Sequence, residues 1–153
     1  MRKALFLDRD GVINIDAGYV HAPEDFVFID GIFDFCQLAV TKGYLIIVVT
    51  NQSGIERGIF SEDEFCRTNS HMLEEFRRRG VEITDVFHCP HLENEDRKPN
   101  PGMFVKAQRK WGIDMAESVS VGDRDRDIQA GAAAGVGKNL IFTGDFNVLK
   151  EAL

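Results

Sequence analysis

Residues 44–54 read Tyr-Leu-Ile-Ile-Val-Val-Thr-Asn-Gln-Ser-Gly, an apolar run that changes abruptly into hydrogen-bonding side chains. A short run this rich in branched aliphatic residues is typical of a strand that is covered on both faces. Similar runs occupy residues 3–7, 85–88, 118–121 and 139–142. Because strands covered on both faces are usually parallel, the sequence predicts a buried parallel sheet.

Helical patterns lie between these runs. Ser61 and Glu64 have the spacing of a capping box, Gly80 follows a charged last turn, and Asn100-Pro101 opens the next helix. This regular alternation predicts a doubly wound, three-layer, Rossmann-like α/β fold with a mostly parallel sheet. We expect one domain over residues 1–153, with no cap domain, because one helix and a loop fill each gap between strands.

Composition narrows the function. The chain has 18 Lys and Arg against 25 Asp and Glu, a net charge of −7, which disfavours binding to a nucleic acid backbone. The three cysteines Cys36, Cys66 and Cys89 form no CxxC pair, which indicates a reducing compartment. No apolar stretch approaches the roughly 20 residues of a membrane span, and no signal sequence is evident. We therefore expect a cytoplasmic protein that binds neither nucleic acid nor membrane, and we expect a monomer.

In doubly wound folds the ligand crevice lies beyond the carboxyl ends of the strands, so these positions are where chemistry is expected. Asp8-Arg9-Asp10-Gly11 follows the first run. The functional interpretation is that Asp8 attacks phosphorus, while Asp10 protonates the leaving oxygen and later takes a proton from water. An ordinary Asp- and Gly-rich turn is the alternative.

The next two strand ends carry groups that suit a phosphate. Thr50-Asn51-Gln52-Ser53-Gly54 offers a hydroxyl and backbone N–H groups, although a plain strand-to-loop transition looks similar. Arg97-Lys98-Pro99 precedes the helix that starts near Pro101, and an exposed basic turn is the alternative there. A cation such as Lys98 would offset about 4 kcal/mol of repulsion per charge pair at an effective dielectric of about 20.

The fourth strand end reads Gly122-Asp123-Arg124-Asp125-Arg126-Asp127. Magnesium commonly takes one or two carboxylates together with water and substrate phosphate, so Asp8, the Asp10 carbonyl and Asp123 are the expected magnesium ligands. Capping of the following helix is the alternative for any one of these acids. Taken together, the four strand ends predict a phosphoryl-transfer pocket.

These four groups resemble the motifs of the haloacid dehalogenase (HAD) superfamily of phosphatases. The strings around Asp8, Thr50 and Lys98 are most similar to the group of histidinol-phosphate and heptose bisphosphate phosphatases. Residues 14–21 and the run Gly54-Ile55-Glu56-Arg57-Gly58 look like the heptose 1,7-bisphosphate enzymes. The resemblance covers essentially the whole chain and implies a magnesium-dependent phosphatase acting on a small sugar bisphosphate, with removal of the 7-phosphate of D-glycero-D-manno-heptose 1,7-bisphosphate as the expected reaction.

By that resemblance Asp8 is the nucleophile, Asp10 the general acid and base, Thr50 and Lys98 phosphate binders, and Asp123 a magnesium ligand, while Asp127 orients its neighbours. The implied contacts to the sugar phosphate are Asp16, Gly18, Tyr19, Thr50, Asn51, Gln52, Ser53, Arg97 and Lys98. Arg124 stands where the family often has lysine.

A larger departure concerns zinc. Relatives commonly carry a Cys-x-His pair and a Cys-x-Cys pair before the Arg-Lys-Pro string, but here only Cys89 and His91 remain. The second pair is replaced by Asn94-Glu95-Asp96, so four tetrahedral ligands are lacking and we expect no structural zinc. The loop from Cys89 to Asp96 is therefore expected to differ in shape, and substrate specificity with it.

Three other functions are compatible with parts of the pattern. A histidinol-phosphate phosphatase and a polynucleotide 3′-phosphatase share the Thr50-Asn51-Gln52 string, although the acidic balance disfavours the latter. A receiver-like phosphorylation switch uses a similar acidic pocket, but in that family the Lys comes last in the chain, whereas Lys98 precedes Asp123. Repeated turnover distinguishes an enzyme from a switch, which is phosphorylated once.

Overall fold

A computed structural model describes all residues 1–153. Its five strands are β1 (Ala4–Leu7), β2 (Leu45–Asn51), β3 (Asp85–Cys89), β4 (Val119–Gly122) and β5 (Lys138–Ile141). They form one sheet in the order β3-β2-β1-β4-β5, and every neighbouring pair is parallel. The predicted parallel α/β sheet is confirmed, and each strand starts and ends within two residues of the expected range.

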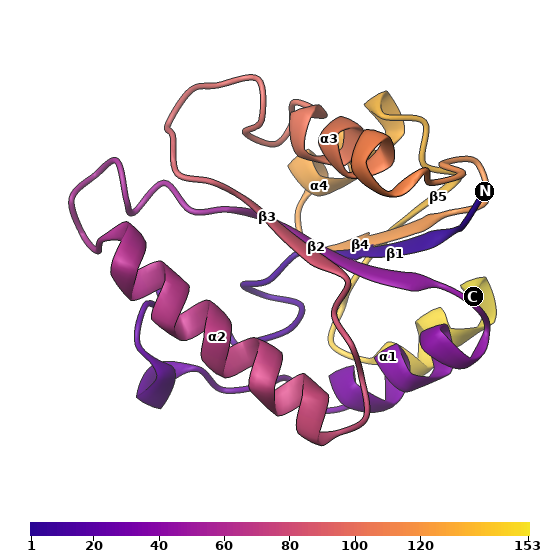
Figure 1. Cartoon of the computed structure of the whole chain (residues 1–153), viewed down its shortest axis with the longest axis horizontal. Helices are drawn as coiled ribbons and strands as arrows, with labels where there is room; N and C mark the ends of the chain where they lie inside the picture. The colour runs from indigo at the N-terminus through magenta and orange to yellow at the C-terminus, as the bar shows by residue number, and fades with distance from the viewer.

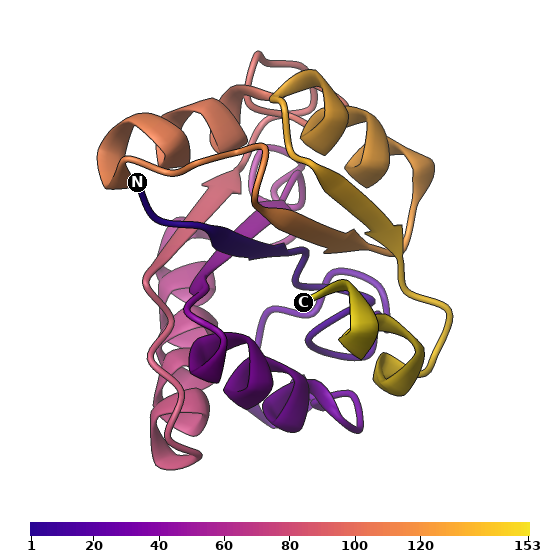
Figure 2. The same cartoon turned by 90° about the vertical axis from the view of Figure 1, so that its right-hand side faces the viewer.

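Four α-helices and two short 3₁₀ helices connect the strands. They are η1 (Pro23–Asp25), α1 (Ile32–Thr41), α2 (Glu62–Arg78), α3 (Gly102–Trp111), α4 (Asp125–Ala133) and η2 (Phe146–Ala152). Helices α1 and α2 lie on one face of the sheet and α3 and α4 on the other, which gives the three expected layers (Figures 1 and 2). The segments between strands hold no inserted cap.

The sheet has a separate hydrophobic core on each face because successive side chains of a strand point to opposite sides. Leu5 and Leu7 pack in the core of 22 buried residues that α1, α2 and η2 cover. Ala4 and Phe6 pack in the core of 13 buried residues under α3 and α4. Both faces of β1 and β2 are therefore buried, as their apolar sequences predict.

The edge strands depart from the expected burial. Strand β5 is exposed or half-buried throughout, and β3 is half-buried except at Cys89. Both lie at the ends of the strand order, where only one neighbour and part of a helix cover them. The position of a strand in the sheet therefore decides how deeply it is buried, and a short apolar run does not encode that position.

Local helix signals follow the sequence. The Ser61 hydroxyl accepts from the Glu64 N–H at 3.1 Å and the Glu64 carboxylate accepts from the Ser61 N–H at 3.1 Å, so the capping box at the start of α2 is formed. No helix combines the length and apolar character needed to cross a membrane.

Candidate active site

The carboxyl ends of β1 and β4 define the site. These strands are neighbours at the point where the strand order reverses direction, and ligands bind at such points in open α/β sheets. Asp8 follows β1 and Asp123 follows β4. Gly11 has φ of 93°, and a β-carbon there would overlap the Asp123 carboxylate, so this position requires glycine for both conformation and space.

Lys98 reaches this point from the loop after β3. Its ammonium donates to Asp8 Oδ1 at 3.0 Å and to the Val49 carbonyl at 2.8 Å, and it lies 2.7 Å from Asp127 Oδ1. The Lys98 side chain is 2% exposed. Two residues separated by 90 positions in the sequence thus form a buried ion pair, as the strand-end argument predicts.

Burial and charge oppose each other in this cluster. Burial raises the pKa of Asp8 to about 7, because the loss of water and the nearby Asp127 and Asp10 carboxylates outweigh the Lys98 ammonium. Burial works against the charge on Lys98, but the carboxylates of Asp8 and Asp127 outweigh it and raise the lysine pKa. The pKa of Asp123 is raised by burial and by Asp127. The cluster therefore holds more negative charge than one lysine balances.

This excess of charge suits a divalent cation. Asp8, Asp123 and Asp127 are the only residues whose ligating atoms gather closely enough to share a metal ion, within 4.8 Å of one another. Oδ1 of Asp127 is buried, and the Lys98 ammonium is its polar neighbour at 2.7 Å. Oδ2 of Asp127 accepts from the N–H groups of Asp123 and Arg124, both at 3.1 Å, so Asp127 also fixes the loop that carries Asp123. Carboxylate oxygens are the donors that Mg²⁺ prefers, and the residues fit that ion.

Asn51 connects the second strand end to Lys98. Its side-chain amide donates to the Lys98 carbonyl at 3.2 Å and accepts from the Lys98 N–H at 3.0 Å. The amide therefore clamps the backbone that carries the lysine, besides lining the pocket. The sequence predicts a contact between Asn51 and the substrate, and the structure shows a contact of Asn51 with the Lys98 backbone that the sequence does not indicate.

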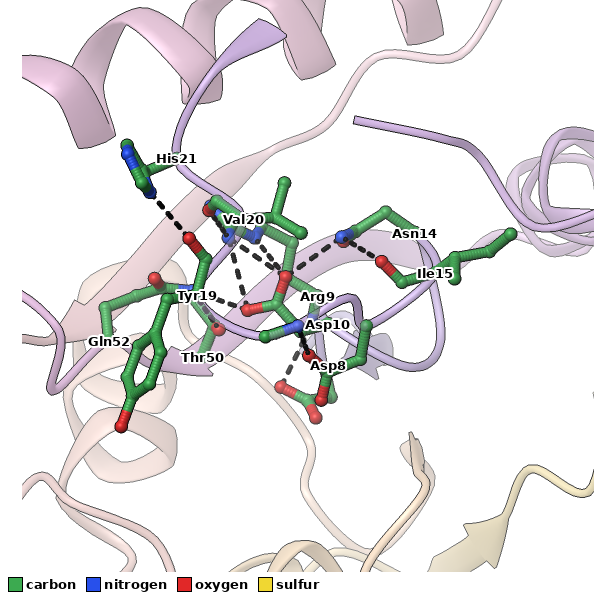
Figure 3. A network of polar contacts seen from close by, with 12 residues as sticks. Asp8, Arg9, Asp10, Asn14, Ile15, Tyr19, Val20, His21, Thr50 and Gln52 are labelled. Carbon is green, nitrogen blue, oxygen red and sulfur yellow. Dashed lines mark hydrogen bonds and ion pairs between the residues drawn. The ribbon is translucent and has the colours of Figure 1, made fainter. Parts of the chain in front are cut away.

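Asp10 and Thr50 meet through Gln52 (Figure 3). The Gln52 amide donates to Asp10 Oδ2 and to the Thr50 hydroxyl, both at 3.0 Å. Thr50 is 1% exposed and Gln52 is 4% exposed, so this link is largely buried. A single side chain, Gln52, thus links Asp10 to the end of β2 at Thr50.

An open pocket of about 360 Å³ lies over these groups. Ten of the residues expected in the site line it: Asp8, Asp10, Asp16, Gly18, Tyr19, Asn51, Gln52, Ser53, Arg97 and Asp123. Thr50 and Lys98 do not line it and instead support Gln52 and Asp8 from beneath. The pocket size falls in the range that holds small organic ligands.

Three further arginines line the pocket, namely Arg57, Arg124 and Arg126. Arg57 comes from the loop after β2, and Nε of Arg126 on α4 is buried without a hydrogen-bond partner. The sequence alone predicts no substrate contact for them, since an arginine in a loop or first helical turn looks like a solvated charge. With Arg97 they place four cations around the carboxylates.

The loop at residues 16–19 closes one side of the pocket with a tight turn. The Gly18 N–H donates to Asp16 Oδ1 at 3.0 Å, and Arg124 Nη2 lies 3.7 Å from Asp16 Oδ2. Tyr19 has φ of 51°, a conformation that non-glycine residues adopt rarely. Such strain is common at ligand sites, where the surrounding structure holds it.

The loop that carries the remnant of the zinc motif is held by polar contacts. Sγ of Cys89 faces the His91 carbonyl at 3.8 Å, and His91 lies 3.6 Å from Glu56. The Asn94 side chain accepts from the Asp96 N–H, and Asp96 pairs with Lys106. Hydrogen bonds thus frame the segment before Lys98, and the absence of structural zinc stays a prediction.

Comparison with known proteins gives close relatives. Residues 96–152 match the HAD-hydrolase-like family. The chain is 45% identical to a D-glycero-alpha-D-manno-heptose-1,7-bisphosphate 7-phosphatase of Campylobacter jejuni, with 99% of this chain and 94% of that protein covered. It is 48% identical to a D-glycero-beta-D-manno-heptose-1,7-bisphosphate 7-phosphatase of Vibrio cholerae, with 94% and 83% covered.

A solved structure agrees with this likeness. The D,D-heptose 1,7-bisphosphate phosphatase of B. bronchiseptica, complexed with magnesium and phosphate, superposes with a TM-score of 0.83 at 32% identity. The alignment covers 89% of this chain and 78% of that one. Fold and sequence therefore point to the same group of phosphatases.

Proposed function

Because the chain belongs to the D-glycero-D-manno-heptose-1,7-bisphosphate 7-phosphatase family of HAD phosphatases, we propose that it hydrolyses the 7-phosphate of this heptose bisphosphate. The relatives are phosphatases, which confirms an enzyme over a phosphorylation switch. The observation that carries the proposal is the buried contact between Asp8 and Lys98 beside Asp123, under a pocket rich in arginine.

The reaction proceeds in two displacements. An Asp8 carboxylate oxygen attacks phosphorus, the bond from phosphorus to the sugar oxygen breaks, and that oxygen takes a proton from Asp10. Water then attacks the aspartyl-phosphate, gives a proton to Asp10, and the bond to Asp8 breaks. Both residues line the same pocket, which makes the two roles geometrically compatible.

Charge neutralisation is the second requirement. Lys98 offsets the repulsion between the Asp8 carboxylate and a phosphate dianion. Asp8 and Asp123, with the Asp10 carbonyl, would hold Mg²⁺. Asp127 accepts a hydrogen bond from the Asp123 N–H and would keep Asp123 in position. When bound, Mg²⁺ supplies further neutralisation of the phosphoryl oxygens.

The four arginines favour a substrate that carries a second phosphate. A monophosphate needs only the cluster at Asp8, yet the pocket places Arg57, Arg97, Arg124 and Arg126 around it. Guanidinium groups bind phosphate through two parallel hydrogen bonds, so this rim suits the phosphate at position 1. Relatives named for both anomers have similar identity to the chain, and the proposal covers both.

The direct test is phosphate release from both anomers of the heptose bisphosphate, with histidinol phosphate as comparator. We expect repeated turnover with Mg²⁺, loss of turnover with EDTA, and a heptose 1-phosphate product by phosphorus NMR. Efficiency on histidinol phosphate should be lower by at least about 10²-fold, because unpaired polar groups would remain in the pocket. Equal efficiency on histidinol phosphate, or a single stoichiometric phosphorylation, would contradict the proposal.

Arg57→Met tests the role of the rim. We expect kcat/KM for the bisphosphate to fall about tenfold, since a hydrogen bond to a charged group contributes about 1.5–3 kcal/mol. Heptose 7-phosphate, which lacks the second phosphate, should lose less than about twofold in kcat/KM. Arg79→Met is the matched control, because Arg79 follows α2 and covers Phe33 away from the pocket. The same loss on both substrates would show that Arg57 does not bind the second phosphate.

A further inference from the structure

Arg9 is the most deeply buried cation beside the site, although it does not line the pocket. Its side chain is 1% exposed, and it stands between the two carboxylates of the opening loop. Figure 3 shows its guanidinium directed at Asp10. Neither phosphate binding nor metal binding, as argued above, gives this buried charge a role.

The guanidinium grips the Asp10 carboxylate as a fork. Nη2 lies 2.9 Å from Oδ1 and 3.2 Å from Oδ2, and Nε lies 3.2 Å from Oδ1. Asn14 donates to Oδ1 at 2.9 Å, and Gln52 donates to Oδ2 at 3.0 Å. Donors on both oxygens fix the plane of the Asp10 carboxylate. The Asp10 side chain is 21% exposed and so remains accessible from the pocket.

Arg9 is itself held by contacts to its guanidinium and to its backbone. The rings of Phe26 and Phe65 lie 5.6 Å and 5.8 Å from the guanidinium carbon, within the range of cation–π attraction. The Arg9 carbonyl accepts from the N–H groups of Val12, Ile13 and Asn14. Both the backbone and the guanidinium of Arg9 are therefore held in place. The side chain is a rigid support for the Asp10 carboxylate.

Arg9 also joins Asp10 to the loop over the pocket. Nη2 donates to the Val20 carbonyl at 2.8 Å, and Val20 follows directly on the pocket residues Gly18 and Tyr19. The Tyr19 carbonyl in turn lies 2.6 Å from Nδ1 of His21. One nitrogen thus contacts both the general acid and the loop that faces the sugar.

We propose that Arg9 is a positioning residue, which holds the Asp10 carboxyl in line with the leaving oxygen and ties that alignment to the loop at residues 16–20. The proposal rests on the proposed function, in which Asp10 donates the proton as the bond from phosphorus to the leaving oxygen breaks. A lysine ammonium is a compact point charge without the planar array of donors that meets both Asp10 oxygens and the Val20 carbonyl, so Arg9→Lys should not restore full alignment.

The experiment compares two leaving groups. Phenyl phosphate releases a weakly acidic phenol and needs proton donation, whereas 2,4-dinitrophenyl phosphate releases a strongly acidic phenol and needs little. Because kcat/KM reports the steps through bond cleavage, its ratio between these esters measures proton donation. For Arg9→Met we expect a loss of about 10²-fold on phenyl phosphate and less than about threefold on the dinitrophenyl ester, with Arg9→Lys in between.

A double-variant cycle gives the second readout. If Arg9 acts through Asp10, adding Arg9→Met to Asp10→Asn should cost no further kcat/KM on phenyl phosphate. Arg79→Met, remote from the pocket, should leave both esters unchanged. Should Arg9→Met fail to fold, Arg9→Lys carries the same comparison, with folding checked by thermal unfolding.

Equal losses on the two esters, or additive losses in the double variant, would overturn the proposal and leave Arg9 a structural role only. Failure of the proposed function has a different signature. In that case the unaltered protein hydrolyses the dinitrophenyl ester but not the heptose bisphosphate, while the leaving-group ratio can still be measured.

Discussion

Asp8→Asn is expected to abolish turnover while the fold survives, and the loss should be at least about 10⁴-fold in kcat, as for nucleophiles elsewhere. An amide of the same shape cannot form the aspartyl-phosphate. Asp8 is 8% exposed and its carboxylate lies among those of Asp127 and Asp10, so removal of its charge relieves repulsion. Without added divalent metal the variant should therefore unfold at a temperature no lower than the unaltered protein.

Two measurements check this result. Phosphate release from the heptose bisphosphate gives the loss, and circular dichroism during heating gives the stability. Asp34→Asn is the matched control, because Asp34 lies exposed near the start of α1 and should keep full activity. A well-folded Asp8→Asn protein with normal turnover would disprove the nucleophile assignment, and a large loss of stability would disprove the electrostatic account.

The convergence of Asp8, Lys98 and Asp123 could be predicted because parallel strands bring their carboxyl ends to one edge of the sheet. A run of aliphatic residues followed by polar ones marks that edge, and this signal does not depend on the conformation of the loops that follow. The sequence therefore located the acids and the lysine without knowledge of any distance. It could not order the five strands, and so it missed the exposure of β5 at the sheet edge.

Side chains that turn inward from loops could not be predicted in the same way. Arg9 is flanked by two aspartates and would ordinarily be exposed, yet Phe26 and Phe65 enclose it. These two rings come from distant segments of the chain, the loop before α1 and the first turn of α2. Arg57 and Arg126 in the pocket are similar cases, because their positions depend on loop paths that residue spacing does not fix.

Lys98→Met is expected to remove activity and, in the absence of divalent metal, to lower the stability of the protein by about 3–5 kcal/mol. The ammonium is the one cation in contact with both Asp8 and Asp127, and methionine has similar length but leaves those charges uncompensated. Chemical denaturation at pH 8 measures the stability. Lys42→Met is the matched control, since Lys42 is exposed and its ammonium donates to the Leu153 carbonyl, not to a carboxylate.

The stability deficit of Lys98→Met should depend on pH in a definite direction. Burial raises the pKa of Asp8 to about 7 in the folded state, from 3.8, and loss of Lys98 removes a group that lowers it. A carboxyl whose folded pKa is raised binds its proton more tightly in the folded state, so protonation favours folding. The deficit should therefore shrink as the pH falls from about 9 to about 7, where Asp8 is ionised beside Lys98 but still protonated in the variant, measured by denaturation with EDTA present. A deficit that stays constant across this range would mean that lost packing, and not uncompensated carboxylate charge, destabilises the variant.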